Sequence, residues 1–180
     1  MWKYTGTKEC NQFLLSLNLF NCKDEKRYIK TLYALANGDA NNYKIYKLKK
    51  HNGKYRTIYE PNQLLKSIQK KILESILETR TISKYAKAYY KGVPLLDNAY
   101  PHINKKLILK LDIKNFFENI SFYRVYESCF SIEYFPKSVG MLFTYLCTCN
   151  NYLIQGAPTS AYISNLVMKE FDEKLGHGVN

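Results

Sequence analysis

One acidic residue has a setting that favours metal chemistry. Asp112 lies near the end of the apolar run 107–113 (LILKLDI), which we expect to form a short buried strand. The carboxyl ends of buried strands are common positions for catalytic groups, and a buried carboxylate needs a partner. Mg²⁺ would provide one, because it binds carboxylates together with substrate phosphates. The pattern equally allows Asp112 to begin a turn or to cap the next helix, so both interpretations stay open.

Two further segments carry groups that can bind phosphates. Residues 155–160 (QGAPTS) place glycine and proline before an expected helix, whose first N–H groups can face a phosphate or a base. Residues 49–56 (KKHNGKYR) are a basic hairpin tip, suited to phosphate contacts through lysine and arginine. Each has a plain alternative, which is a strand–turn–helix junction for the first and a solvated hairpin with edge-protecting lysines for the second.

The positive charge is concentrated in one part of the chain. The 180 residues contain 27 Lys and Arg against 15 Asp and Glu, a net charge of +12. Residues 41–110 hold 16 of the basic and 4 of the acidic residues, so the rest of the chain is balanced. This segment is also rich in tyrosine, and it favours nucleic acid as a partner over a membrane surface. An A/T-biased gene would raise lysine and tyrosine too, but it would not leave the flanks neutral.

The periodicity of apolar residues predicts the elements that must position these groups. The expected helices span 9–20, 24–36, a segment that begins at Pro61, 122–130, 136–147 and 158–175. The expected strands span 43–49, 54–59, 107–113 and 152–155, the first two forming a hairpin around His51-Asn52-Gly53. Ser121 is the expected cap of the helix over 122–130. Phe171 and Leu175 are among the residues that we expect to face inward on the last helix.

Composition indicates one globular domain. Hydrophobic residues make up 46% of the chain and charged residues 23%. No apolar run approaches the roughly 18 residues of a membrane span, and the N-terminus has no small-residue cleavage site. Five cysteines without a C-x-x-C pair fit free thiols in a reducing compartment and give zinc little weight. We therefore expect a cytoplasmic protein without a membrane segment.

Four segments, taken in order, match the blocks of one enzyme family. The hairpin, Pro61 and the helix containing Gln69 fit the form K-x-x-G-x-x-R-x-I-x-x-P. The other three are 98–102 (NAYPH), of the form N-A-x-x-H, 109–120 (LKLDIKNFFENI), with its aspartate, and 155–175 (QGAPTSAYISNLVMKEFDEKL), of the form Q-G-x-P-x-S followed by a helix. Over residues 43–175 the chain resembles a bacterial reverse transcriptase of the retron type.

The resemblance implies an α+β fold, the fingers and part of the palm of a right-hand polymerase. We expect an N-terminal helical segment over 1–40, a basic fingers region over 41–106 and a partial palm over 107–180. The family's Y-x-D-D hairpin and its thumb would follow the last helix, and no Asp-Asp pair occurs in these 180 residues. Asp172-Glu173 resembles the family's acidic helix end and does not replace that pair. One aspartate cannot hold two divalent ions, so we expect this chain alone to be inactive.

The resemblance also implies roles for individual residues. Asp112, assisted by the backbone carbonyl of Ile113, would bind the two catalytic Mg²⁺ ions, with Mn²⁺ as an alternative ion. Phe117 would be the steric gate that favours dNTPs over ribonucleotides. The alternative for Phe116 and Phe117 is that both belong to the core.

Other residues would contact the nucleotide or the RNA. The implied nucleotide contacts are Lys49, Arg56, Ile113, Phe117, Gln155 and Gly156. The implied RNA contacts are Lys54, Asn98 and His102, although an isolated histidine is more often structural.

By resemblance, the protein would be an RNA-directed DNA polymerase that copies a structured noncoding RNA by two-metal nucleotidyl transfer. Its partners would be the RNA template and primer, the nascent DNA, dNTPs and an effector protein, and its role would lie in antiphage defence. One alternative is a non-catalytic RNA-binding protein derived from such an enzyme. Another is a defence polymerase that works without a template.

Overall fold

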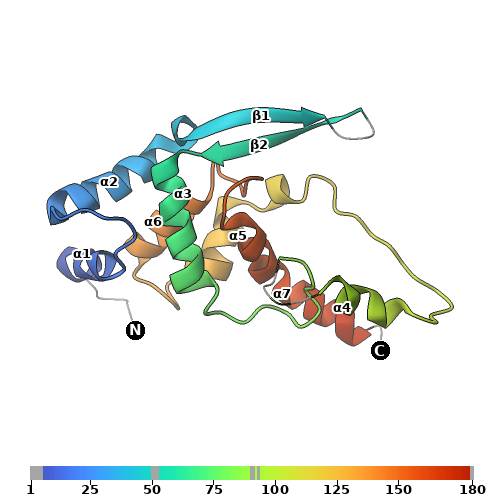
Figure 1. Cartoon of the computed structure of the whole chain (residues 1–180). Coiled ribbons are helices and arrows are strands. Elements are labelled where there is room, and N and C mark those ends of the chain that lie inside the picture. The colour runs from blue at the N-terminus through green and yellow to red at the C-terminus, as the bar shows by residue number, and fades with distance from the viewer. Residues whose placement is uncertain (1–5, 50–52, 90–91, 93, 179–180) are drawn as a thin grey trace.

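The computed structural model describes residues 6–49, 53–89, 92 and 94–178, and it combines helices with one β-hairpin (Figure 1). The helices are α1 (Thr7–Ser16), α2 (Glu25–Gly38), α3 (Gln63–Ile72), α4 (Leu95–Ala99), α5 (Phe122–Val125), α6 (Lys137–Cys147) and α7 (Ser160–Gly178). Short 3₁₀ turns are η1 (Asp39–Asn42), η3 (Tyr100–His102) and η4 (Phe117–Asn119), and short π-helices are η2 (Leu73–Leu77) and η5 (Tyr126–Phe130). The two strands are β1 (Tyr43–Lys49) and β2 (Tyr55–Pro61). An α+β content is therefore observed.

The hairpin has the predicted strands. β1 and β2 pair antiparallel from Tyr43 opposite Pro61 to Lys49 opposite Tyr55. Of the predicted turn, His51 and Asn52 lie outside the described residues, and Gly53 has the positive φ (+76°) that favours glycine. We expected Pro61 to begin a helix, but it is the last residue of β2. Asn62 caps α3 instead, since its side-chain oxygen accepts a hydrogen bond from the Leu65 amide at 2.9 Å.

Two other caps explain where helices begin. The Asp24 carboxylate accepts from the Arg27 amide at 3.0 Å and starts α2. Ser121 caps the helical stretch α5–η5, as predicted, by accepting from the Arg124 amide. The first helix ends before position 20 because the chain turns there, and the buried Tyr28 hydroxyl fixes that turn. It donates to the Leu14 carbonyl at 3.1 Å and accepts from the Leu19 amide at 2.8 Å.

One apolar core joins α1, α2, α3, α6 and the first half of α7. Gln69 of α3 is completely buried within it. Its amide nitrogen donates to the Tyr43 hydroxyl at 3.1 Å and to the Leu146 carbonyl at 2.8 Å. Gln69 therefore connects the base of the hairpin, through α3, to the end of α6.

Our division of the chain into 1–40, 41–106 and 107–180 stays a prediction.

The prediction of a buried strand over 107–113 is wrong for this structure. The segment forms an extended connection between the α4 end of the molecule and η4 (Figure 1). Leu107 is 89% exposed and Leu109 76%, and no described residue pairs with the segment in a ladder. A strand needs neighbouring strands for its hydrogen bonds, and the apolar pattern alone does not supply them.

Two smaller expectations also fail. Residues 152–155 contain only Tyr152 in isolated bridges, to Ser121 and Cys149, and form no regular strand. Phe171 and Leu175 are exposed because the second half of α7 extends beyond the core. In the part of the chain that is described, no helix combines the length and apolar character needed to cross a bilayer.

Removing the Gln69 amide should destabilise the fold. In Gln69→Leu, the buried Tyr43 hydroxyl and Leu146 carbonyl each lose a donor, and we expect a loss of about 1–3 kcal/mol in the free energy of unfolding. Urea unfolding followed by circular dichroism measures it. Gln63→Leu, at an exposed position of the same helix, is the matched control and should change stability by less than about 0.5 kcal/mol. Equal stability of the two variants would contradict this role of Gln69.

Candidate functional site

The free edge of β2 lies against the turn at Gln155 and Gly156. The Tyr59 amide donates to the Gln155 carbonyl at 2.8 Å, on the side of β2 away from β1. Gly156 has φ +116°, and a Cβ placed there would lie 2.5 Å from the Tyr59 carbonyl oxygen. Only glycine allows this approach, because any side chain would be both strained and in collision with backbone. The structure thus brings together the basic hairpin and the Q-G-x-P-x-S segment, two of the segments singled out in the sequence.

A hydroxyl pair strengthens the same junction. The half-buried Tyr59 and Tyr152 share a hydrogen bond between their hydroxyls, with 2.9 Å between the oxygens. This bond and partial burial raise the pKa of Tyr59 to about 12, so the Tyr59 hydroxyl is protonated near neutral pH. A second contact joins the loop of Tyr152 to the turn that precedes β1. The backbone amide of Asn150 donates to the Asp39 carboxylate at 3.0 Å.

The register separates two predicted nucleotide contacts. Lys49 pairs with Tyr55 and Arg56 pairs with Leu48, and neighbouring side chains of a strand point to opposite faces. Arg56 therefore shares its face with Ile58, whose Cγ2 would lie 3.0 Å from a Cβ at Gly156. Lys49 belongs to the other face. Arg56 thus lies on the face of Ile58, beside Gly156, whereas Lys49 lies on the face of Tyr59, whose hydroxyl meets Tyr152 of the same loop.

The hairpin keeps most of its positive charge. Lys44, Lys47 and Lys49 of β1 are exposed, as are Lys54 and Arg56. The hairpin's one carboxylate among the described residues, Glu60, accepts a hydrogen bond from the Tyr46 hydroxyl and lies 3.8 Å from the Lys66 ammonium. These two contacts balance the negative charge of Glu60 locally, so the hairpin tip remains a cationic surface.

Asp112 and Ile113 lie in the extended segment and are exposed. Within the described ranges, Asp112 forms no ion pair, and no group of three or more His, Cys, Asp or Glu side chains is placed to hold a metal ion. Phe117 begins η4 and is half-buried. Its ring contacts the ring of Phe116 edge-on, with 5.5 Å between centroids, and both pack against the core.

Asn98 and His102 do not join the hairpin. Both are exposed, on α4 and η3, and Figure 1 draws α4 well apart from the two strands. The structure therefore offers these two residues a surface separate from the Gln155–Gly156 junction.

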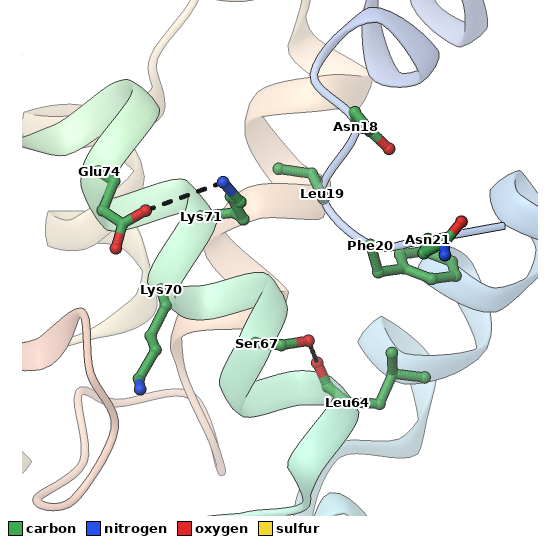
Figure 2. A pocket seen from close by; sticks show the side chains of 9 residues that line it. All are labelled: Asn18, Leu19, Phe20, Asn21, Leu64, Ser67, Lys70, Lys71 and Glu74. Carbon is green, nitrogen blue, oxygen red and sulfur yellow. Dashed lines mark hydrogen bonds and ion pairs between the residues drawn. The ribbon is translucent and has the colours of Figure 1, made fainter.

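Sequence patterns did not identify Tyr59, Tyr152 or Asp39. The chain has 17 tyrosines, and nothing in the sequence indicates that Tyr59 and Tyr152 bond to each other. The two residues lie 93 positions apart. A hollow was also missed. Figure 2 shows it between α3 and the connection from α1 to α2, with Lys71 ion-paired to Glu74 at 4.0 Å and Ser67 donating to the Leu64 carbonyl. Its lining also contains Lys70, two asparagines and apolar side chains, and no chemistry follows from this mixture.

Comparison with known proteins points in one direction. Residues 48–179 match the family described as reverse transcriptase (RNA-dependent DNA polymerase). Retron Ec86 reverse transcriptase of Escherichia coli is 32% identical over 135 residues, which cover 74% of this chain and 42% of that protein. Retron Ec83 reverse transcriptase, also of Escherichia coli, is 32% identical over 161 residues, covering 84% of this chain and 51% of that protein. Retron Se72 reverse transcriptase of Salmonella heidelberg is 36% identical over 126 residues, covering 69% and 33%. The chain thus spans a third to a half of the length of these relatives.

Replacing Gly156 should open the junction. In Gly156→Ala the new Cβ meets the Tyr59 carbonyl at 2.5 Å, and the strained φ alone costs about 1–3 kcal/mol. We expect that loss in urea unfolding, together with faster hydrogen exchange at the Tyr59 amide.

Gly53→Ala is the matched control. Gly53 also has a positive φ, but nothing lies within 4 Å of its Cβ position, so its cost is conformational only, about 1–2 kcal/mol. Exchange at the Tyr59 amide should stay unchanged there. If Gly156→Ala also leaves that amide protected, the close approach does not hold the junction.

Proposed function

The chain belongs to the reverse transcriptase (RNA-dependent DNA polymerase) family, and from this premise we propose that it forms the fingers and the first part of the palm of a retron-type RNA-directed DNA polymerase. The observation that carries the proposal is the docking of the basic hairpin on the Gln155–Gly156 turn. The exposed basic residues of the hairpin would then bind phosphates beside the segment that would shape the nucleotide pocket.

We assign the contact with the incoming triphosphate to Arg56. Its face continues through Ile58 to Gly156, and a guanidinium suits a phosphate because it donates two parallel hydrogen bonds. Lys49, on the opposite face, and Lys54 would contact RNA phosphates instead. Gln155 and Gly156 would form the floor of the pocket. Asn98 and His102 would contact the RNA at a second surface, near α4.

Asp112 fits one part of a metal site. An exposed carboxylate and the neighbouring Ile113 carbonyl are oxygen donors of the kind that Mg²⁺ takes, but they are too few for a two-ion centre. The Y-x-D-D hairpin of the family would add the missing carboxylates and pair with the extended segment 107–113. Metal bound there would stabilise the charge of the phosphoryl group being transferred. Phe117, packed against Phe116, would restrict the space beside the nucleotide sugar.

The substrates would be a structured noncoding RNA with its primer and dNTPs. An effector protein, a cytoplasmic location and a role in antiphage defence belong to the same proposal. A non-catalytic RNA-binding protein is the second candidate, because the exposed lysines and arginine of the hairpin would bind RNA phosphates without any metal ion.

Catalysis should depend on Asp112 in a complete active site. We would fuse this chain to the remainder of Retron Ec86 reverse transcriptase and measure dNTP incorporation on an RNA template with Mg²⁺. Asp112→Asn should lower incorporation at least about 10³-fold, since a metal-binding carboxylate is lost, and leave RNA affinity nearly unchanged. The matched control, Glu118→Gln, removes an exposed carboxylate six residues away and should keep full activity. Incorporation by Asp112→Asn at the control's rate removes Asp112 from catalysis.

RNA binding by the 180-residue chain should depend steeply on salt. A plot of log affinity against log salt concentration should have a slope of several units, about 0.7 per phosphate contacted on single strands. The Lys54→Gln/Arg56→Gln double variant should lower that slope by about one to two units, whereas Lys26→Gln, exposed on α2, should not. Fluorescence anisotropy with a labelled RNA measures both. A flat salt response in the unchanged chain refutes the cationic-surface argument.

A further inference from the structure

We propose that the hydroxyl pair of Tyr59 and Tyr152 is a clasp that sets the orientation of the basic hairpin, which makes both tyrosines positioning residues for Arg56. The inference rests on the proposed function, because Arg56 is there assigned to the triphosphate. It adds a device, not given by the family blocks, that would hold this arginine over the pocket.

The clasp has two bonds on one residue. Through its amide, Tyr59 binds the Gln155 carbonyl at 2.8 Å, and through its hydroxyl it binds Tyr152, with 2.9 Å between the oxygens. A single bond would let the strand pivot, whereas two bonds from opposite ends of one residue fix both the position and the rotation of β2. The Tyr59 ring also meets the Tyr43 ring edge-on, with 6.3 Å between centroids. Tyr43 is in turn held by Gln69, so the clasp is anchored in the core.

The loop on the other side of the clasp is itself fixed. The Leu153 amide donates to the Ile120 carbonyl at 2.8 Å, and the Phe122 amide donates to the Asn151 carbonyl at 2.8 Å. Tyr152 lies between these two bonds. Because Ile120 directly follows η4, the clasp relates the hairpin to the turn that carries Phe117.

The position of Arg56 depends on how β2 is oriented at Tyr59. It lies three residues beyond Tyr59 toward the tip, about 10 Å along a strand at about 3.4 Å per residue. A small rotation at Tyr59 is therefore enlarged at the guanidinium, and a misplacement of about 1 Å at a reacting group can cost up to about 100-fold in rate. The hydroxyl pair suits the task because it is half-buried and neutral, and solution ions screen it little.

The test uses the 180-residue chain with Tyr59→Phe, Tyr152→Phe and the double variant. Phenylalanine keeps the ring packing and removes the hydroxyl bond. Hydrogen exchange of the amides in 53–60 should become about 2- to 10-fold faster in each single variant, and the free energy of global unfolding should fall by the equivalent amount, at most about 1.4 kcal/mol. The double variant should be no faster than Tyr59→Phe, because the bond between the two hydroxyls is already lost there. Tyr55→Phe, on the same strand and 63% exposed, is the matched control and should leave exchange unchanged.

A second measurement separates positioning from simple structural support. Binding of dATP with Mg²⁺, followed by titration calorimetry, should weaken about 3- to 10-fold in Tyr59→Phe and remain unchanged in Tyr55→Phe. Arg56→Gln should weaken it as well and should keep normal hydrogen exchange, because that residue acts on the ligand and not on the junction.

The outcomes distinguish the inference from the function on which it rests. If exchange in 53–60 does not respond to Tyr59→Phe, there is no clasp, whatever the chain binds. If exchange responds but dATP affinity does not, the pair anchors the hairpin without positioning Arg56, and the inference fails. If the unchanged chain and Arg56→Gln bind dATP equally, the proposed nucleotide site fails, and the positioning role fails with it.

Discussion

The structure depends on the close approach of two backbones, one from the outer edge of β2 and the other at Gly156. A hydrogen bond from the Tyr59 amide to the Gln155 carbonyl and a glycine with φ +116° make that approach possible. It joins residues that are almost a hundred positions apart. Without it the hairpin would be tied to the helices mainly at its base, through Tyr43, Gln69 and the bond from the Asn62 amide to the Asn42 carbonyl.

The helices and the hairpin have different roles in the molecule. The helices supply an apolar core in which the buried Gln69 side chain bonds to both the hairpin and α6. The hairpin supplies the exposed lysines and arginine, and its single described carboxylate is used locally by Tyr46 and Lys66. A cationic tip on a rigid base suits a polyanionic ligand, because the base limits the conformational entropy lost on binding. This arrangement agrees with membership of the reverse transcriptase family.

Local patterns allowed much of the fold to be predicted. Strand alternation located the hairpin, and Ser121 and Pro136 marked the starts of helical stretches, since caps and periodicity are local properties. The run 107–113 was assigned as a strand on composition, but a strand requires neighbours that the described residues do not provide. Pro61 gave an ambiguous signal, because proline is tolerated at the end of an edge strand as well as in a first helical turn.

The candidate site was predicted in part. The hairpin and the Gln155–Gly156 turn were named from sequence, but no pattern indicated that they touch, or that Tyr59 and Tyr152 join them. The opposite orientation of Lys49 and Arg56 follows from strand parity and the observed register. The metal-binding role of Asp112 rests on the resemblance to the family's blocks alone. Within the part of the chain that the structure describes, its exposed side chain has no contact that supports or contradicts this role.

The lysines within and beside the extended connection have a consequence for colloidal behaviour. Leu107, Ile108, Leu109 and Leu111 form an apolar ribbon with accessible main-chain groups, the kind of segment that templates cross-β fibrils. Lys110 interrupts the ribbon, and Lys105, Lys106 and Lys114 flank it. These charges act as gatekeepers, because stacking identical copies would place ammonium groups above one another. If an apolar residue replaced Lys110, residues 107–111 would be five consecutive apolar residues, so we expect Lys110 to oppose cross-β stacking wherever this segment is left uncovered.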